Sequence, residues 1–358
     1  MRIVQIIDSL EVGGAEKMAV NYANTLVDKI EFTGLIATRK EGALKVSLKK
    51  EVNYLYLKKN KIIDIVAIYK LAKYCVEHKI DTLHSHSSSY FISFLVKLLL
   101  PRIKIIWHDH NGMSAFITKK ETFVLKIASF FFKGIIVVNY QLENWAFKQL
   151  NCKNVLYLPN FTTLENDVVS STVLKGLEGK RILCLANLRP QKNHFFLIEI
   201  AKKLKGDFPN WTFHLVGKDF NDEYSTKVKE TILSNKLQNN VFVYDSRNDI
   251  VNIMNQCQIA ILTSKSEGLP IAFIEYGLSK MPVVTTKVGE IPLILKDGIS
   301  GFLVEVNDVE LFHQRIKKFI MDEDLRIQFG NALFETIISN HSEGVVIDLY
   351  LNWLINTK

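Results

Sequence analysis

The stretch Ser264-Lys-Ser-Glu-Gly-Leu-Pro-Ile-Ala-Phe-Ile-Glu-Tyr-Gly-Leu-Ser279 decides the fold. It follows the apolar run Ile259 to Leu262 and leads into the β-branched run Val283 to Thr286. This order predicts a strand, a loop that turns at Gly268, a helix from about Pro270 and a second strand. Proline is tolerated in a first helical turn because its missing N–H would be unpaired there. A strand, a helix and a second strand in succession predict a parallel sheet.

Two acids in this stretch, Glu267 in the loop and Glu275 inside the helix, lie eight residues apart. The free N–H groups and positive dipole at a helix start favour anions, phosphate above all. A carboxylate beside phosphate would be repelled, so we expect each acid to accept hydrogen bonds from hydroxyl groups. A helix start for phosphate and two acids for hydroxyls suit a sugar nucleotide.

Strand and helix patterns alternate from end to end and predict an α/β protein with two Rossmann-like domains facing across a cleft. The predicted strands are short apolar runs: Arg2–Ile7, Phe32–Ala37, Val52–Leu57, Thr82–His84, Ile103–Trp107, Ile135–Val138, Val155–Leu158, Ile182–Leu185, Phe213–Val216, Val241–Tyr244, Ile259–Leu262, Val283–Thr285 and Gly301–Val304. The polar stretch Thr162 to Lys180 is interpreted as the interdomain connection, carrying a short helix. We therefore place the domains at 1–162 and 163–340, with a C-terminal helix over 341–358.

Composition favours a soluble cytoplasmic protein. The 358 residues are 48% apolar and 23% charged, which excludes disorder and gives ample core. The longest apolar stretch, Tyr90 to Leu100, is interrupted by Lys97 and is too short to span a bilayer. A strand pattern starts at Arg2, so we expect no signal peptide before the fold. The four cysteines lack metal-ligand spacing and are interpreted as free buried thiols.

Positive charge is concentrated in the first half. Residues 1–160 carry 23 Lys and Arg against 13 Asp and Glu, or +10, and the remainder carries 22 against 24, or −2. One interpretation is a solvated basic face; the other is attraction to an anionic membrane surface or a pyrophosphate-linked acceptor. Nucleic acid is not expected as a partner, because no binding module accompanies the charge.

An ordered set of motifs resembles the retaining glycosyltransferases with two Rossmann-like domains and an E-x7-E signature, typified by bacterial polysaccharide and lipopolysaccharide transferases. Besides the E-x7-E segment, the matching motifs are Gly13-Gly-Ala-Glu16, Asp81-Thr-Leu-His-Ser-His86, Ile106-Trp-His-Asp-His110, Leu158-Pro-Asn160, Asn187-Leu-Arg-Pro-Gln-Lys192, Leu215-Val-Gly217 and Asp297-Gly-Ile-Ser-Gly-Phe-Leu303. The resemblance covers nearly the whole chain.

The resemblance implies the GT-B fold, with a C-terminal helix that crosses back to the N-terminal domain. It implies a retaining, metal-independent hexosyltransferase that uses a UDP- or GDP-sugar as substrate, without a cofactor. The acceptor is a saccharide or a lipid-linked saccharide in cell-surface polysaccharide biosynthesis, which allows a peripheral position on the inner face of the membrane.

The resemblance also implies functional roles for residues at the matching positions of these motifs. The catalytic set implied is His110, Lys192, Arg189 and Glu267, with His108 as an alternative to His110. The nucleotide-sugar set implied is Gly13, Gly14, Gly217, Gly268, Leu269, Pro270 and Glu275, and Asp249 is expected to face the base. The chain departs from the family where Ala186-Asn187 replaces a Gly-Arg pair, and where Glu290 and Leu293 replace a glycine and an acid. Lys192 therefore carries over more directly than Arg189.

The histidines form two i, i+2 pairs, His84 with His86 and His108 with His110, at the predicted carboxyl ends of strands. Such pairs can bind a metal, but the sequence offers no obvious third ligand, so we predict no metal site. His84 is interpreted as a core residue.

Two other functional classes compete with a transferase. A sugar-nucleotide epimerase could use the same scaffold, because fold does not fix chemistry. A non-catalytic binding subunit is disfavoured because the chain keeps Glu267, Glu275, Lys192 and His110. An NAD dehydrogenase is excluded because the first glycine loop lacks the G-x-G-x-x-G pattern.

Overall fold

The chain folds into two compact α/β units, each built on one parallel sheet. The computed structural model describes residues 1–110, 119–164 and 170–356, with side chains from 111 to 121 outside that description. Unit 1 comprises residues 1–162 together with 343–358, and unit 2 comprises 163–342.

Unit 1 is built on the seven-stranded sheet A, in the order β3-β2-β1-β4-β5-β6-β7. All of its strand pairs are parallel. Its elements are β1 (Arg2–Ser9), α1 (Gly14–Leu26), β2 (Phe32–Lys40), η1 (Ala43–Ser47), β3 (Asn53–Tyr56), α2 (Ile65–Glu77), β4 (Thr82–His86), η2 (Ser87–Ser89), α3 (Tyr90–Leu99), β5 (Lys104–Asp109), α4 (Lys119–Ala128), η4 (Ser129–Phe131), β6 (Gly134–Val137), α5 (Tyr140–Gln149), β7 (Val155–Tyr157) and α13 (Glu343–Asn356).

Helix α2 shows how local chemistry sets an element in unit 1. Asp64 caps it, because its carboxylate accepts a hydrogen bond from the Ala67 N–H at 3.1 Å. Of the apolar residues at helical spacing between Ile65 and Val76, Ala72 and Ile68 pack in the core, whereas Ile65, Tyr69 and Val76 face away from it. Ile65 is 78% exposed and Tyr69 is 68% exposed, whereas Leu71 is fully buried. Helix α2 therefore carries an apolar face turned away from the core of unit 1.

Unit 2 is built on the six-stranded sheet B, in the order β10-β9-β8-β11-β12-β13, again parallel throughout. Its elements are β8 (Arg181–Leu185), η5 (Pro190–Lys192), α6 (His194–Asp207), β9 (Thr212–Val216), α7 (Glu223–Ser234), β10 (Val241–Tyr244), α8 (Ile250–Asn255), β11 (Ile259–Leu262), α9 (Ile271–Leu278), β12 (Val283–Thr286), α10 (Ile291–Ile294), β13 (Phe302–Val304), α11 (Val309–Met321) and α12 (Glu323–His341).

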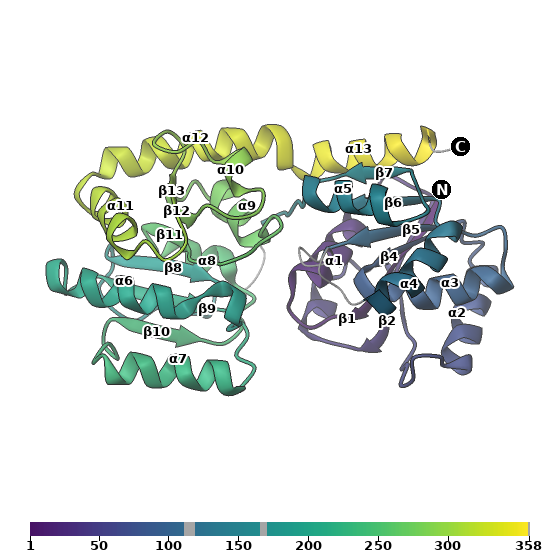
Figure 1. Ribbon diagram of the computed structural model, residues 1–358, viewed down its shortest axis with the longest axis horizontal. Coiled ribbons are helices and arrows are strands. Elements are labelled where there is room, and N and C mark those ends of the chain that lie inside the picture. Colours follow the sequence, from purple (N-terminus) through teal and green to yellow (C-terminus); the bar gives the residue numbers. More distant parts are fainter. Residues whose placement is uncertain (111–118, 165–169, 357–358) are drawn as a thin grey trace. The chain divides into compact units, whose positions relative to one another are not determined.

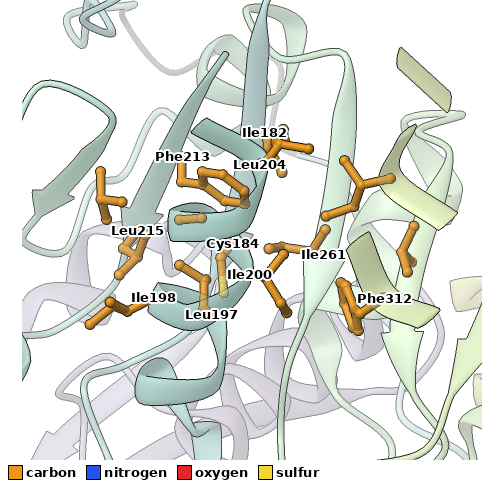
Figure 2. Packing of buried hydrophobic residues seen from close by; sticks show 14 of the residues in the cluster. Ile182, Cys184, Leu197, Ile198, Ile200, Leu204, Phe213, Leu215, Ile261 and Phe312 are labelled. Carbon is orange, nitrogen blue, oxygen red and sulfur yellow. The ribbon is translucent and has the colours of Figure 1, made fainter. Parts of the chain in front are cut away.

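The core of unit 2 shows why these residues form strands and helices together. Residues of β8 and β9 point alternately at helix α6, as Figure 2 shows for Ile182, Cys184, Phe213 and Leu215. The buried face of α6 meets them with residues spaced at helical intervals, among them Leu197 and Leu204. Burying one such side chain contributes on the order of 1.5–3 kcal/mol.

The last helix, α13, belongs to unit 1 although it follows unit 2 in sequence, which confirms the predicted return of the C-terminal helix. Figure 1 shows α13 in yellow alongside β6 and β7. Trp353 donates a hydrogen bond from its Nε1 to Asn154 Oδ1 at 3.1 Å, and its ring fills the space that a Cβ on Gly134 would need. The buried face of α13 consists of Val346, Ile347 and Tyr350, whereas Leu349 is 52% exposed.

All thirteen predicted strands are present within a few residues of their predicted bounds. Within the polar stretch, residues 163–164 and 170–180 contain no helix, and 165–169 lie outside the described residues. The four cysteines are free and buried, as predicted. In the part of the chain that the structure describes, no helix has both the length and the apolar character needed to cross a bilayer.

Candidate functional site

The best-formed polar constellation of unit 2 joins Lys192, Glu267 and Ser264. The Lys192 ammonium lies 2.5 Å from Glu267 Oε1, and the Ser264 hydroxyl donates to the same oxygen at 2.6 Å. The side chains are 21% exposed for Lys192 and 9% exposed for Glu267. Both contacts end on Oε1, so Oε2 receives no hydrogen bond from the described residues. The ammonium has three N–H donors, of which this ion pair uses one.

Backbone contacts fix this constellation at the carboxyl edge of sheet B. The Lys192 carbonyl accepts a hydrogen bond from the Thr263 hydroxyl at 3.0 Å, and the Lys265 N–H donates to the Gln191 carbonyl at 2.8 Å. Asn193 follows in the left-handed region, at φ 56°, and turns the chain into helix α6. The loops after β8 and β11 are therefore bonded to each other, so sequence-distant Lys192 and Glu267 meet.

The start of helix α9 lies directly after Glu267. Pro270 precedes the first helical residue, as predicted, and Leu269 is buried. The Gly268 carbonyl accepts a hydrogen bond from the Glu290 N–H at 3.0 Å. Gly289 has φ 57°, and a Cβ there would come within 2.2 Å of the Gly268 carbonyl oxygen, so this crossing requires glycine. Glu275 follows in the second turn of α9 and is 6% exposed.

Two further predicted residues lie on neighbouring loops. A Cβ on Gly217 would come within 2.3 Å of the Ala186 carbonyl oxygen, so glycine allows the loops after β8 and β9 to touch. Arg189 stacks over the Phe220 ring, with 4.6 Å from the guanidinium carbon to the ring centroid. The Arg189 carbonyl accepts a hydrogen bond from the Lys192 N–H at 2.9 Å, but among the described residues its guanidinium forms no hydrogen bond with Lys192 or Glu267. The structure thus brings Lys192 and Glu267 together and leaves Arg189 on its own.

Asp249, which the resemblance places facing a base, forms several hydrogen bonds within unit 2. Its carboxylate accepts hydrogen bonds from the backbone N–H groups of Ser171 and Thr172 at 2.9 and 2.7 Å and from the Thr172 hydroxyl at 2.8 Å. Burial would raise the pKa of Asp249, but these hydrogen bonds outweigh it and hold the pKa well below its ordinary value. Asp249 therefore ties the incoming chain to helix α8.

Unit 1 contains a layer of four histidines, defined here as His84 and His86 from β4, His108 from β5 and His110 just after it, of which His110 is half-buried and the other three are buried. His86 Nδ1 lies 2.7 Å from His110 Nε2, and His84 Nε2 lies 3.2 Å from His108 Nδ1. Each pair forms a hydrogen bond with one further residue. Gln5 Oε1 is 2.9 Å from His86 Nε2, and the Tyr350 hydroxyl of α13 is 3.1 Å from His84 Nδ1.

The Gln5 contact sets the proton positions of one pair. Because Gln5 Oε1 can only accept, His86 Nε2 carries the proton and His86 Nδ1 accepts from His110 Nε2–H. The lone pair of neutral His110 is then on Nδ1, which has no hydrogen-bond partner among the described residues. Burial lowers the pKa of His110 to about 3 and lowers those of the other three well below their ordinary value, so all four are neutral at pH 7.

The sequence reasoning missed the neighbours of this layer. Gln5, Tyr22 and Tyr350 are each fully buried, and Tyr22 packs edge-on against His84. The alternation of β1 could have revealed Gln5 as a polar residue on a buried face. The statement that no third metal ligand accompanies the pairs was wrong: nitrogens of His84, His86 and His108 lie within 4.8 Å of one another. Several of these nitrogens are engaged in the hydrogen bonds just described.

The first glycine loop of unit 1 lies at the start of helix α1. Gly13 precedes the helix in an extended conformation and Gly14 is its first residue. The Glu16 carboxylate folds back onto Gly13, where a Cβ would meet it within 2.2 Å, whereas a Cβ on Gly14 would meet nothing within 4 Å. Glu16 therefore covers this helix start in the present structure.

Comparisons with known proteins agree across both units. Residues 12–165 match the family model described as Glycosyltransferase Family 4, and residues 170–335 match the one described as Glycosyl transferases group 1.

Two curated relatives and one solved structure illustrate the likeness. An Escherichia coli UDP-Gal:alpha-D-GlcNAc-diphosphoundecaprenol alpha-1,3-galactosyltransferase is 25% identical over 82% of this chain and 80% of its own. A Staphylococcus aureus poly(ribitol-phosphate) alpha-N-acetylglucosaminyltransferase is 22% identical over 70% of this chain and 49% of its own. The crystal structure of Anabaena HepE with UDP and glucose has a TM-score of 0.83 at 18% identity and covers 99% of both chains.

Proposed function

The chain belongs to the glycosyltransferases that join a family 4 domain to a group 1 domain in the GT-B fold, and from this we propose that it transfers a hexosyl unit from a UDP- or GDP-sugar, with retention, to a lipid-linked saccharide in cell-surface polysaccharide biosynthesis. The observation that carries the proposal is the Lys192–Glu267–Ser264 constellation, which lies directly before the start of helix α9. The diphosphoundecaprenol acceptor named for the Escherichia coli relative supports the acceptor class.

The roles follow from the chemistry of each group. Departure of a nucleoside diphosphate builds negative charge, and Lys192 has two N–H donors beyond its ion pair to stabilise that charge. Arg189 supplies a second cation from the same loop, so the proposed reaction needs no metal. Glu267 Oε2 accepts from hydroxyls of the sugar, and Glu275 accepts from the ribose diol. Of the predicted glycines, Gly14 leaves room for a ligand to approach the backbone, Gly13 does so once the Glu16 carboxylate moves aside, and Gly217 lets the loops after β8 and β9 pack together.

In unit 1 the proposed contact to the donor sugar is His110. Its Nδ1 lone pair, left open by the Gln5–His86 chain, can accept a hydrogen bond from a sugar hydroxyl. His108 also has one ring nitrogen without a partner among the described residues, but it is the less suitable of the two because it is only 1% exposed, whereas His110 is half-buried.

A product assay tests this function. A thermal-shift screen of nucleotide sugars identifies the donor, because a bound ligand raises the melting temperature by mass action. Release of nucleoside diphosphate that depends on an added saccharide acceptor then supports transfer, and donor conversion without an acceptor would indicate an epimerase. The anomeric configuration of the product reports retention, and activity that persists with a chelator reports metal independence.

The substitution Glu275→Gln is expected to weaken donor binding without unfolding unit 2. The amide keeps the shape but loses charge-assisted hydrogen bonds to the ribose, each worth about 1.5–3 kcal/mol at most. Calorimetric titration with the nucleoside diphosphate should show a Kd raised by about ten-fold or more. An unchanged Kd would remove Glu275 from the site, and Glu199→Gln, on the exposed face of α6, serves as a control.

The peripheral membrane position is also part of the proposal. Helices α3 and α4 and the turn η4 expose apolar side chains beside cations: Leu98, Leu99, Phe123, Ile127 and Phe130, which are 52%, 59%, 64%, 42% and 72% exposed. Lys126 is exposed among them, and the side chains of Lys119 and Lys120 lie outside the described residues. Each cation near an anionic leaflet contributes about 1 kcal/mol, and the attraction fades within roughly 8 Å at physiological salt.

Binding to liposomes is expected to require anionic lipid and to weaken as salt is raised. Reversing Lys119, Lys120 and Lys126 to Glu should release the protein in a co-sedimentation assay while nucleotide binding, assigned to unit 2, stays intact. Equal binding to neutral and anionic liposomes, or to neither, would contradict the membrane proposal and favour a soluble acceptor.

A further inference from the structure

One lysine of unit 1 is buried without a hydrogen-bonding partner for its charge. Lys59, just after β3, is only 6% exposed, and its ammonium forms no hydrogen bond or ion pair with the described residues. Its backbone is fixed, because its N–H donates to the Thr38 carbonyl at 2.7 Å and Lys58 before it turns the chain at φ 56°. Burial of Lys59 therefore concerns its aliphatic stem, whereas its ammonium is not among the buried polar atoms that lack a partner and is accessible to a ligand.

The surroundings of Lys59 lie at the point where ligands bind parallel sheets. The strand order of sheet A reverses between β1 and β4, and Asp8 of β1 bridges this switch point by accepting from the Ser88 hydroxyl at 2.6 Å. The same carboxylate accepts from the Thr38 hydroxyl and lies 3.8 Å from Arg39 Nε, at an irregularity in the β1–β2 pairing. Asp8 is thus shared among several donors.

Around Lys59 there is more positive charge than negative charge to balance it. Burial lowers the pKa of Lys59 and Arg39 lowers it further, whereas Asp8 and Asp64 act in the opposite direction. Asp64 is committed to the cap of α2, where it also accepts from the Asn60 N–H at 3.1 Å. Two cations therefore face one shared carboxylate, an arrangement that an added anion would balance.

The chain that follows Lys59 is apolar and exposed. Ile62 and Ile63 are 72% and 59% exposed, and the outward face of α2 continues the surface with Ile65, Val66 and Tyr69, each at least 63% exposed. Apolar side chains gathered beside a cation without a partner suit a ligand with a phosphate head and a hydrocarbon tail. A free phosphate would contact the Lys59 ammonium but not the exposed isoleucines.

We propose that Lys59 and Arg39 bind the diphosphate of a lipid-linked acceptor, with the lipid chain lying on Ile62, Ile63 and the first turn of α2. This inference rests on the proposed transferase function, for which it names the acceptor class and its binding residues. The diphosphate approaches the carboxyl ends of β1, β2 and β4, and the lipid leaves along α2. Lys59 and Arg39 are binding residues and take no part in bond breaking.

Calorimetric titration of the full chain with farnesyl diphosphate tests the site without any sugar nucleotide. The native protein should bind it, and Lys59→Met should weaken binding about ten-fold or more, because a charge-assisted contact is lost. Arg39→Gln should weaken it in the same direction. Because the Lys59 ammonium has no partner among the described residues, Lys59→Met should leave the melting temperature near the native value. Lys148→Met, at an exposed position on α5, should bind as the native protein does.

Further titrations test the part of the site that binds the lipid chain. The double variant Ile62→Ser with Ile63→Ser should weaken farnesyl diphosphate but leave inorganic pyrophosphate unaffected, and farnesol should bind poorly. Native affinity in Lys59→Met would overturn the site, and equal binding of pyrophosphate and farnesyl diphosphate would overturn the lipid assignment. Binding that fails in Lys59→Met supports the site even if no sugar transfer is found. Transfer to a lipid-linked acceptor that Lys59→Met leaves unchanged supports the function and overturns the site.

Discussion

Replacing Lys192 by alanine is expected to lower kcat by on the order of 100-fold or more, the usual cost of losing one preorganised group that stabilises developing charge. The ammonium is fixed by Glu267 and by the loop contacts of Thr263, so it is already in place when the nucleoside diphosphate departs. Charge on that leaving group grows toward the transition state, so the loss should appear in kcat more than in KM.

Steady-state kinetics at saturating donor measure this effect. Lys192→Met keeps the aliphatic stem and should show a similar loss, whereas Lys202→Ala, exposed on α6, should leave both constants near the native values. A rise in KM with kcat unchanged would mean that Lys192 binds only the ground state. Because Glu267 loses its ion pair in these variants, the melting temperature should be measured alongside.

The histidine layer is expected to make unit 1 sensitive to acid. Burial lowers the pKa of all four imidazoles in the folded state, that of His110 to about 3, whereas in the unfolded chain they titrate near 6.5. Below pH 6.5 the unfolded state therefore binds more protons, and stability falls as the pH falls. Between pH 6.5 and 5.5 each histidine lowers the free energy of unfolding by about 1 kcal/mol, so the four together lower it by roughly 4 kcal/mol.

Urea unfolding at a series of pH values, followed by tryptophan fluorescence, measures this loss. Histidines of unit 2 add to it, because burial also lowers the pKa of His194 to about 4 and that of His214 to about 3. The double variant His84→Gln with His86→Gln isolates the layer and should lose about half of its contribution. If the variant and the native protein lost stability equally between pH 6.5 and 5.5, the layer would not be the acid-sensitive element.

Much of the fold could be predicted from the sequence because parallel strands buried on both faces are near-continuous apolar runs. The βαβ unit around Glu267 and Glu275 was correct to within a residue or two at each boundary. Helix α2 differs, because Ile65, Tyr69 and Val76 form an exposed apolar face that the core does not cover. Periodicity shows that a helix has an apolar face but does not show what covers it.

The candidate sites were also predictable only in part. Lys192 and Glu267 could be named from motifs, but their contact depends on how the loops after β8 and β11 bond to each other. The link from His84 to Tyr350 joins residues 266 positions apart, and no local pattern encodes it. Lys59 sits in a run of basic residues that looks like a solvated surface, and only the fold reveals that one of them is buried.

The membership of α13 in unit 1 has a consequence for how the chain is made. Residues 1–162 leave the ribosome long before Tyr350 is synthesised. The histidine layer therefore lacks its contact with Tyr350 while the whole second half of the chain is being made. Unit 2 is contiguous in sequence and can complete its core as it emerges. The last stretch of translation therefore finishes the first domain, and a ribosome that stops before α13 would release a chain whose second half is complete and whose first half is still open.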